Sequence, residues 1–120
     1  MASTVLIVDD LADFRAVARV MLETGGYRIV GEAGTGADGL GEAARLRPDI
    51  VLLDVRLPDV DGFTLCRELR TRMPTVKVVL CSARDATDYG SRITDCGACG
   101  FLLKSELSST ALTRLVTGCR

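Results

Sequence analysis

Short apolar runs alternate along the whole chain with segments whose apolar residues recur at helical spacing. The apolar runs lie at residues 5–8, 29–33, 50–53, 76–81 and 100–103. After the first run, apolar residues between positions 14 and 22 fall at i, i+3, i+4, i+7 and i+8, which is one face of a helix. Shorter patterns of the same kind follow the other runs, and the polar segment around Asp85 is predicted to open a helix that carries Tyr89 and Ile93. The chain is therefore predicted to consist of consecutive β–α units.

This alternation limits the possible folds to a small number. Strands covered by helices on both faces are nearly continuous apolar runs, as these are. Successive parallel strands are joined by right-handed crossovers. The simplest arrangement is an α/β fold, a doubly wound (βα)5 flavodoxin-like parallel sheet with strand order 2-1-3-4-5 and helices on both faces. The 120 residues fit one domain, positions 1–120.

The balance of charges excludes several classes of partner. Fifteen basic and sixteen acidic residues give a net charge of −1. No field of one sign points to nucleic acid or to an anionic membrane, so we expect this chain to bind neither directly. The N-terminal stretch has no basic region and its apolar run is short, so no signal peptide is predicted and a cytoplasmic location is expected.

The cysteine and histidine contents exclude other kinds of site. The chain has no histidine, which excludes imidazole-based zinc sites and histidine-dependent catalytic triads. The five cysteines are odd in number and no export signal is present, which argues against a disulfide framework. Cys66 and Cys81 are expected in the core as small hydrophobic residues, and Cys119 is expected to be exposed.

A C-x-x-C pair, Cys96 and Cys99, raises the alternative of a redox or metal site. A reactive pair of this kind belongs at the N-terminus of a helix, where the helix dipole lowers the thiol pKa. Here the pair follows a predicted helix and precedes the apolar run at 100–103. One such pair also cannot complete a four-cysteine zinc site unless the other cysteines converge on it. Both alternatives are therefore disfavoured.

Polar residues of complementary kinds follow four of the predicted strands. They are Asp9 and Asp10, Asp54, Ser82 and Lys104. The carboxyl ends of parallel strands meet at one edge of the sheet, where ligands of such sheets bind. Taken singly, Asp10 or Ser82 could be an ordinary helix cap or turn residue. Together they bring three carboxylates to one point, which requires a cation or bound protons, and Mg²⁺ suits such oxygen ligands.

Four segments together resemble the receiver domain of two-component response regulators. They are VLIVDD at 5–10, IVLLDVRLPDVDG at 50–62, VVLCSA at 78–83 and GFLLK at 100–104. The resemblance extends over roughly residues 4–117. It implies a phosphorylation-activated switch in a phosphorelay, which accepts a phosphoryl group from a sensor histidine kinase. Such a domain is not a conventional enzyme, although it promotes its own phosphotransfer and dephosphorylation.

By this resemblance, Asp54 is the phosphoacceptor, whose carboxylate attacks phosphorus and forms an acyl phosphate. Asp9 and Asp10 are expected to hold Mg²⁺, or Mn²⁺ in its place, together with Asp54 and the backbone carbonyl of Arg56. The ion would offset the charge on the phosphoryl group during transfer.

The resemblance also implies how phosphorylation is read out. Lys104 is expected to pair with one phosphoryl oxygen, and Ser82 to donate a hydrogen bond to another. Phe101 is expected to swing inward as Ser82 moves, although a static core position is the alternative. The fourth helix, fifth strand and fifth helix would form the signalling surface and a homodimer contact. The expected output is transcription through a DNA-binding domain outside this chain, or protein contact by a stand-alone receiver.

Three positions depart from the family pattern. Ser105 stands where many receivers have proline, so a trans or an unusually constrained peptide bond is expected before it. The segment GFLLKS is more similar to receivers that precede a helix-turn-helix domain. Arg56 and Arg84 lie two residues after Asp54 and Ser82. They flank the path of an attacking water and are expected to tune dephosphorylation.

Two other functions share parts of this pattern. An aspartyl-phosphate-type phosphatase also uses an aspartate nucleophile, but it typically needs a second aspartate two residues later, where this chain has Arg56. A flavodoxin-like cofactor binder needs Ser, Thr or Gly after the first strand, where Asp9 and Asp10 stand. The receiver function is therefore favoured.

The segment 50–62 contains two further acidic residues. Asp59 is predicted to face solvent, and Asp61 is predicted to cap the following helix. Neither is expected to take part in the chemistry.

Overall fold

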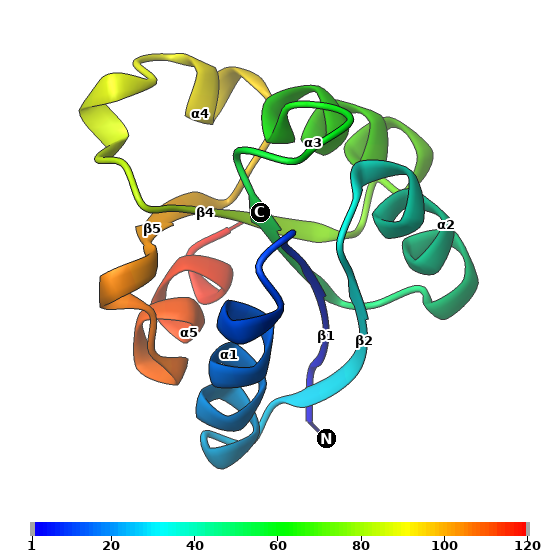
Figure 1. The fold of residues 1–120 in the computed structure, drawn as a ribbon, viewed down its shortest axis with the longest axis vertical. Helices are drawn as coiled ribbons and strands as arrows, with labels where there is room; N and C mark the ends of the chain where they lie inside the picture. The colour runs from blue at the N-terminus through cyan, green and yellow to red at the C-terminus, as the bar shows by residue number, and fades with distance from the viewer. Residues whose placement is uncertain (1, 120) are drawn as a thin grey trace.

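The computed structural model describes residues 2–119 as a parallel sheet with helices on both faces (Figure 1). The strands are β1 Thr4–Val8, β2 Arg28–Ala33, β3 Ile50–Asp54, β4 Lys77–Ser82 and β5 Gly100–Leu103. They pair in parallel in the order β2-β1-β3-β4-β5. The predicted fold class and strand order are therefore confirmed.

Helices cover the sheet in two layers. They are α1 Ala12–Thr24, α2 Gly36–Leu46, α3 Gly62–Arg72, α4 Arg92–Asp95 and α5 Ser109–Thr117. Helices α2, α3 and α4 lie on one face of the sheet, and α1 and α5 lie on the other (Figure 1). Two single-turn 3₁₀ helices, η1 Ala86–Asp88 and η2 Lys104–Glu106, lie beyond the carboxyl ends of β4 and β5. Within residues 2–119, no helix has both the length and the apolar character needed to cross a bilayer.

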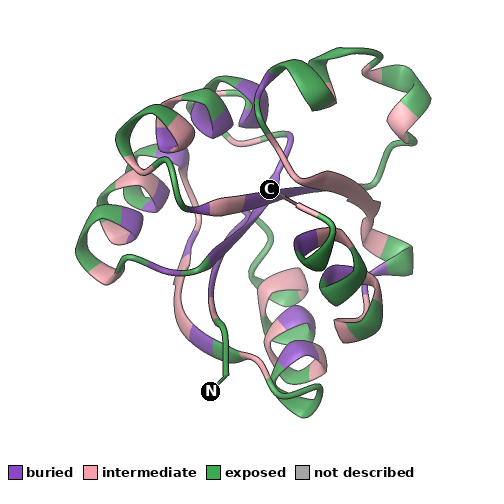
Figure 2. Cartoon of the chain, turned by 180° about the vertical axis from the view of Figure 1, so that it is seen from behind, coloured by how far each residue is buried: buried purple, intermediate pink, exposed green. Residues whose placement is uncertain are grey.

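The central strands carry the core on both of their faces. Every residue of β3 is buried, as are residues 5–8 of β1. Leu6 and Val8 pack with residues of α2 and α3, whereas Val5 and Ile7 pack with residues of α1 and α5, as the alternation of side chains along a strand requires. Figure 2 shows the buried faces of the helices turned toward the sheet. A fully buried β3 thus ends in a carboxylate at the rim of the sheet.

The helix predicted to run from Asp85 past Ile93 is interrupted. Asp85 caps only the single turn η1, by accepting hydrogen bonds from the backbone N (3.0 Å) and the hydroxyl (3.1 Å) of Thr87. Gly90 then has a φ of 58°, a left-handed conformation that ends right-handed helical structure. Helix α4 therefore begins only at Arg92, and the prediction of one continuous helix is wrong.

The expectation that the cysteines form no disulfide is also wrong. Cys99 and Cys119 are disulfide-bonded, with their Cα atoms 5.2 Å apart, so Cys119 is neither free nor fully exposed. The bond joins the residue before β5 to the segment after α5. Cys66 and Cys81 are buried free thiols, as predicted. Cys96 is also a buried free thiol and is not bonded to Cys99. The C-x-x-C pair is therefore not a disulfide unit of its own.

Candidate functional site

Four strands bring polar side chains to one rim of the sheet. Asp54 and Ser82 are the last residues of β3 and β4, Asp9 and Asp10 follow β1, and Lys104 follows β5. Because β1 and β3 pair in register, Asp9 and Asp54 lie side by side. All of these residues were singled out from the sequence, and the structure places them together.

Asp9, Asp10 and Asp54 form an acidic cluster. One carboxylate oxygen of each residue lies within 4.8 Å of those of the other two. Asp9 and Asp54 are buried, whereas Asp10 is exposed. Asp10 is not the cap of α1, because that position belongs to Leu11, whose backbone N donates a hydrogen bond to Asp9 Oδ1 at 2.9 Å. The ordinary role considered for Asp10, that of a helix cap, is thereby excluded.

The donor set of this cluster fits a hard divalent cation. Asp9 Oδ2 is buried, and the ammonium of Lys104 lies 2.8 Å from it. One ammonium does not balance three converging carboxylates, and a bound divalent cation would supply the missing positive charge. Mg²⁺ is typically held by one or two carboxylates and keeps several waters, which exposed Asp10 would allow. The backbone N of Arg56 donates to Asp54 Oδ1 at 3.2 Å, so the Arg56 peptide lies beside the cluster.

Lys104 is the cation that the chain itself supplies to the cluster. Its Nζ lies 2.8 Å from Asp9 Oδ2 as an ion pair, and 3.4 Å from Asp54 Oδ2. The ammonium also lies over the ring of Phe14, 4.6 Å from the centroid. Burial acts to lower the pKa of Lys104, but the two carboxylates outweigh it and raise that pKa above its ordinary value. Lys104 therefore carries a full positive charge beside Asp54.

The carboxyl group of Asp54 is unusually basic for an aspartate. Burial, and after it the negative charge of Asp9, raise the pKa of Asp54 to about 6. The amide of Arg56 and the ammonium of Lys104 act in the opposite direction without cancelling the effect. Asp54 thus combines burial with access to the rim, which is the environment in which carboxylates take part in chemistry.

Ser82 is held by contacts that the sequence did not reveal. The buried Ser82 hydroxyl accepts a hydrogen bond from the backbone N of Arg84 at 3.1 Å. Its Oγ also lies 2.8 Å from the hydroxyl oxygen of Tyr89. The spacing of Tyr89 predicts only that it lies in a helix, and no local pattern indicates that it reaches Ser82. Phe101 is half-buried, with its ring centroid 5.9 Å from that of Tyr89.

A pocket of about 280 Å³ opens over this rim. Its lining residues are Asp10, Leu11, Asp54, Arg56, Ser82, Ala83, Arg84 and Lys104. Arg56 and Arg84 are exposed and stand on the two sides contributed by β3 and β4. The peptide bond between Lys104 and Ser105 is trans, since the described residues contain no cis peptide bond.

Asp59 and Asp61 both accept hydrogen bonds from backbone N atoms at the start of a helix. Asp61 accepts a hydrogen bond from the backbone N of Thr64 and caps α3, as predicted. Asp59 is exposed, as predicted, but its carboxylate also accepts hydrogen bonds from the backbone N atoms of Gly36 (2.8 Å) and Ala37 (2.9 Å) at the start of α2. The description of Asp59 as merely solvent-facing was therefore incomplete.

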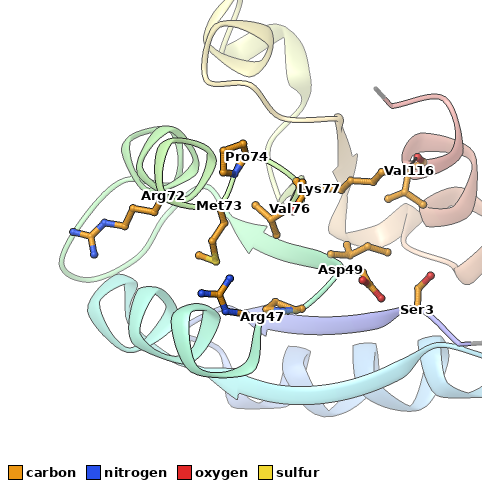
Figure 3. Close-up of a pocket in the computed structure, with 12 residues that line it drawn as sticks. Ser3, Arg47, Asp49, Arg72, Met73, Pro74, Val76, Lys77 and Val116 are labelled. Atoms are coloured by element: carbon orange, nitrogen blue, oxygen red, sulfur yellow. Dashed lines mark hydrogen bonds between the residues drawn. The ribbon is translucent and has the colours of Figure 1, made fainter.

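A second cavity, of about 520 Å³, lies at the opposite edge of the sheet and includes none of the site residues. Figure 3 shows its lining, with Lys77 directed toward Val116. Lys77 Nζ donates a hydrogen bond to the backbone oxygen of Val116 at 2.9 Å, and Asp49 accepts one from Thr4 at the same edge. These charged groups are occupied in holding strands and helices together.

Comparisons with known proteins agree with this geometry. The chain matches the family model described as the response regulator receiver domain over residues 5–116. The signal receiver domain of the response regulator NarL from Mycobacterium tuberculosis superposes on it with a TM-score of 0.89 and 31% sequence identity, covering 98% of each chain.

Two curated relatives align over most of this chain. The response regulator GacA of Pseudomonas aeruginosa is 35% identical over 101 residues, which is 83% of this chain and 47% of GacA. Protein-glutamate methylesterase/protein-glutamine glutaminase 6 of Anaeromyxobacter dehalogenans is 40% identical over 111 residues, 92% of this chain and 31% of that protein. The chain thus spans about half the length, or less, of these curated relatives. It belongs to the family of response regulator receiver domains.

Proposed function

We propose that residues 1–120 act as one receiver domain of a two-component system, switched by phosphorylation of Asp54. The observation that carries the proposal is the position of Asp54, the last residue of a fully buried strand, beside Asp9 and Lys104. The other acids of the 50–62 segment, Asp59 and Asp61, are engaged by the backbone N atoms of helix termini. Asp54 is thus the carboxylate of this segment that is available for chemistry.

In the proposed reaction, a carboxylate oxygen of Asp54 forms a bond to the phosphorus of a phosphohistidine on a sensor kinase. The bond between phosphorus and the histidine nitrogen breaks, and its electron pair stays on that nitrogen, so an acyl phosphate is formed on Asp54. Lys104 lies where it can pair with a phosphoryl oxygen, and Ser82 lines the same pocket and can donate a hydrogen bond to another. Positioning and charge neutralisation supply most of the catalysis of such transfers.

The metal ion of the proposed reaction is Mg²⁺, with Mn²⁺ as an alternative. Asp9, Asp10 and Asp54 would hold it, together with the backbone carbonyl of Arg56. When bound, such an ion offsets negative charge on the transferring phosphoryl group. The convergence of three carboxylates beside the one ammonium of Lys104 supports this assignment.

The proposed output surface consists of α4, β5 and α5. Phosphorylation would draw the Ser82 hydroxyl toward the new oxygens, and Phe101 would follow, changing this surface and any homodimer contact made through it. The segment GFLLKS favours control of transcription through a DNA-binding domain. The methylesterase relative carries an enzyme activity in its name, and a stand-alone receiver that acts by protein contact is the other alternative.

Phosphorylation by a small-molecule donor tests the proposal. The protein is incubated with Mg²⁺ and acetyl phosphate or phosphoramidate, and its intact mass is measured. We expect an adduct of one phosphoryl group that is lost in Asp54→Ala and retained in the matched control Asp59→Asn from the same segment. Absence of an adduct with both donors would contradict the proposal. Turnover of unrelated phosphomonoesters would instead favour the phosphatase.

Arg56 and Arg84 are proposed to set the lifetime of the acyl phosphate. Both are exposed and line the pocket over Asp54, so their long side chains flank the route of an attacking water. Decay of the adduct after removal of the donor should be faster in Arg56→Asn and Arg84→Glu. Unchanged lifetimes in both variants would exclude this role.

A further inference from the structure

A hydrogen bond between two hydroxyl groups connects the proposed phosphorylation pocket to an aromatic cluster formed by Phe63, Tyr89 and Phe101. Ser82 Oγ lies 2.8 Å from Tyr89 Oη, and either hydroxyl can be the donor. Ser82 lines the pocket, whereas Tyr89 is not among its lining residues. Tyr89 is therefore linked to the phosphorylation pocket through the Ser82 hydroxyl.

The ring of Tyr89 is packed between three other elements. Its centroid lies 5.4 Å from that of Phe63 on α3, in an edge-to-face arrangement, and 5.9 Å from that of Phe101 on β5. The guanidinium of Arg92, the first residue of α4, lies 5.9 Å from the Tyr89 centroid and 5.2 Å from that of Phe63. A change in the position of Tyr89 would thus alter its packing contacts with α3, α4 and β5 together.

We infer that Tyr89 is a positioning residue whose hydroxyl restrains Ser82. Loss of the hydrogen bond between Tyr89 and Ser82 transmits the effect of Asp54 phosphorylation to α4. The inference rests on the proposed function and names the residue that couples the pocket to the output surface. By this inference Tyr89, and not Phe101 alone, is the first residue outside the pocket whose position changes on phosphorylation.

The hydrogen-bonding capacity of a serine hydroxyl explains the coupling. The group has one proton to donate and two lone pairs. The Arg84 backbone N already donates to the Ser82 oxygen at 3.1 Å. If Ser82 gives its proton to a phosphoryl oxygen, Tyr89 must become the donor of the remaining contact or lose it. A charge-assisted bond to phosphate is stronger than a bond between two neutral hydroxyls, so the serine is drawn toward the pocket and away from Tyr89.

The mobility required of Tyr89 is compatible with its surroundings. Gly90, with its left-handed φ of 58°, separates Tyr89 from α4, and η1 is a single turn with no buried residue. The segment thus has few buried contacts to hold it in place, which is the property of elements that move in switches. The aromatic cluster, by contrast, links this segment to α3 and β5.

Intrinsic fluorescence can report on Tyr89 alone. The chain has two tyrosines and no tryptophan, so Tyr27→Phe leaves Tyr89 as the sole emitter. In this background we expect Mg²⁺ with beryllium fluoride, a mimic of the phosphoryl group, to change the emission intensity of Tyr89. The change should be absent in Asp54→Ala and lost in Ser82→Ala, while the phosphoryl adduct formed by acetyl phosphate is followed in parallel by intact mass.

Removal of the Tyr89 hydroxyl supplies a second measurement. Tyr89→Phe keeps the ring and its packing, so it should release Ser82 and speed phosphorylation by acetyl phosphate by roughly 2- to 10-fold, the range expected for one neutral hydrogen bond. The matched control is Tyr27→Phe, which removes the hydroxyl that contacts Thr113 and should leave the rate unchanged. In a Ser82→Ala background, Tyr89→Phe should have no effect, which separates coupling through Ser82 from a merely structural role.

The outcomes separate this inference from the function on which it rests. An adduct on Asp54 with no change in Tyr89 emission, or with an unchanged rate in Tyr89→Phe, would overturn the inference and leave the proposed function intact. Absence of an adduct would overturn both.

Discussion

The ammonium of Lys104 lies closer to Asp9 than to Asp54, at 2.8 Å from Asp9 Oδ2 against 3.4 Å from Asp54 Oδ2. Lys104 is therefore first the counterion of the buried Asp9 and only second that of Asp54. The arrangement keeps the positive charge at the rim while Asp54 Oδ1 is held by the amide of Arg56. One lysine thus pairs with both buried acids of the cluster and lies where it can also pair with a phosphoryl group.

Replacement of Lys104 by methionine should destabilise the protein. Loss of the ammonium leaves the Asp9 carboxylate buried without its partner, so the free energy of unfolding near neutral pH should fall by roughly 1–3 kcal/mol in the presence of a chelator. Urea unfolding measures the change. The loss should shrink in an Asp9→Asn background, and an equal loss in both backgrounds would show that the Lys104–Asp9 pair is not its cause.

The pKa of Asp54 predicts a pH-dependent effect of Asp54→Asn. Because the pKa of Asp54 is raised from 3.8 to about 6 in the folded protein, the folded state favours the protonated form of Asp54 more than the unfolded state does. Its contribution to stability is fully present below about pH 4 and is lost as the pH rises through about 6. Without metal, Asp54→Asn should therefore exceed the natural protein in stability by up to about 3 kcal/mol at about pH 7.5 and differ little near pH 4.

Urea midpoints at the two pH values, both with a chelator, test the sign of this effect. An Asp54→Asn variant that is less stable than the natural protein at the higher pH would contradict the raised pKa of Asp54. Asp61→Asn, which alters a carboxylate whose pKa is lowered by its partners, is the control and should show no gain.

Asp59 should stabilise α2 from outside the helix. Its carboxylate accepts hydrogen bonds from Gly36 N and Ala37 N, and these two amides hold the pKa of Asp59 below its ordinary value. Asp59→Ala should lower Tm by a few degrees at neutral pH, since it leaves helix N-terminal donors without a partner. A group with a depressed pKa contributes stability that is lost as the pH falls through its folded-state pKa, so the difference should disappear in acid.

Thermal unfolding at neutral and at acid pH measures the contribution of Asp59. Asp88→Ala removes another exposed acid and should leave Tm unchanged. Equal Tm values for Asp59→Ala and Asp88→Ala would rule out the capping role.

The disulfide between Cys99 and Cys119 should raise stability under oxidising conditions. Its cysteines are 20 residues apart, and closing a loop of this length in the unfolded chain is worth about 3 kcal/mol in the chain-entropy model. A reductant should therefore lower Tm of the natural protein and leave Cys119→Ser unaffected. Alkylation of the unfolded, unreduced protein should label only Cys66, Cys81 and Cys96, and labelling of all five cysteines would exclude the bond.

Much of the site could be predicted because its residues are tied to local patterns. An apolar run that ends in an acid, as residues 50–54 do, predicts both a buried strand and a carboxylate at its end. The same reasoning applied to β1, β4 and β5 predicted the positions of Asp9, Ser82 and Lys104. The interruption before α4 was missed because periodicity in Tyr89 and Ile93 outweighed Gly90, whose left-handed φ depends on the surrounding fold.

The sequence by itself therefore determined the fold, the strand order and the polar residues that share one rim of the sheet. Only the tertiary structure decided that Tyr89 bonds Ser82, that Asp59 accepts hydrogen bonds from the start of α2 and that Cys99 is joined to Cys119. The physical reason is that buried residues recur with the period of a strand or helix. A short stretch of sequence therefore suffices to predict which of its residues are buried. Contacts between side chains of separate elements depend on the spacing and orientation of those elements, which no local period contains.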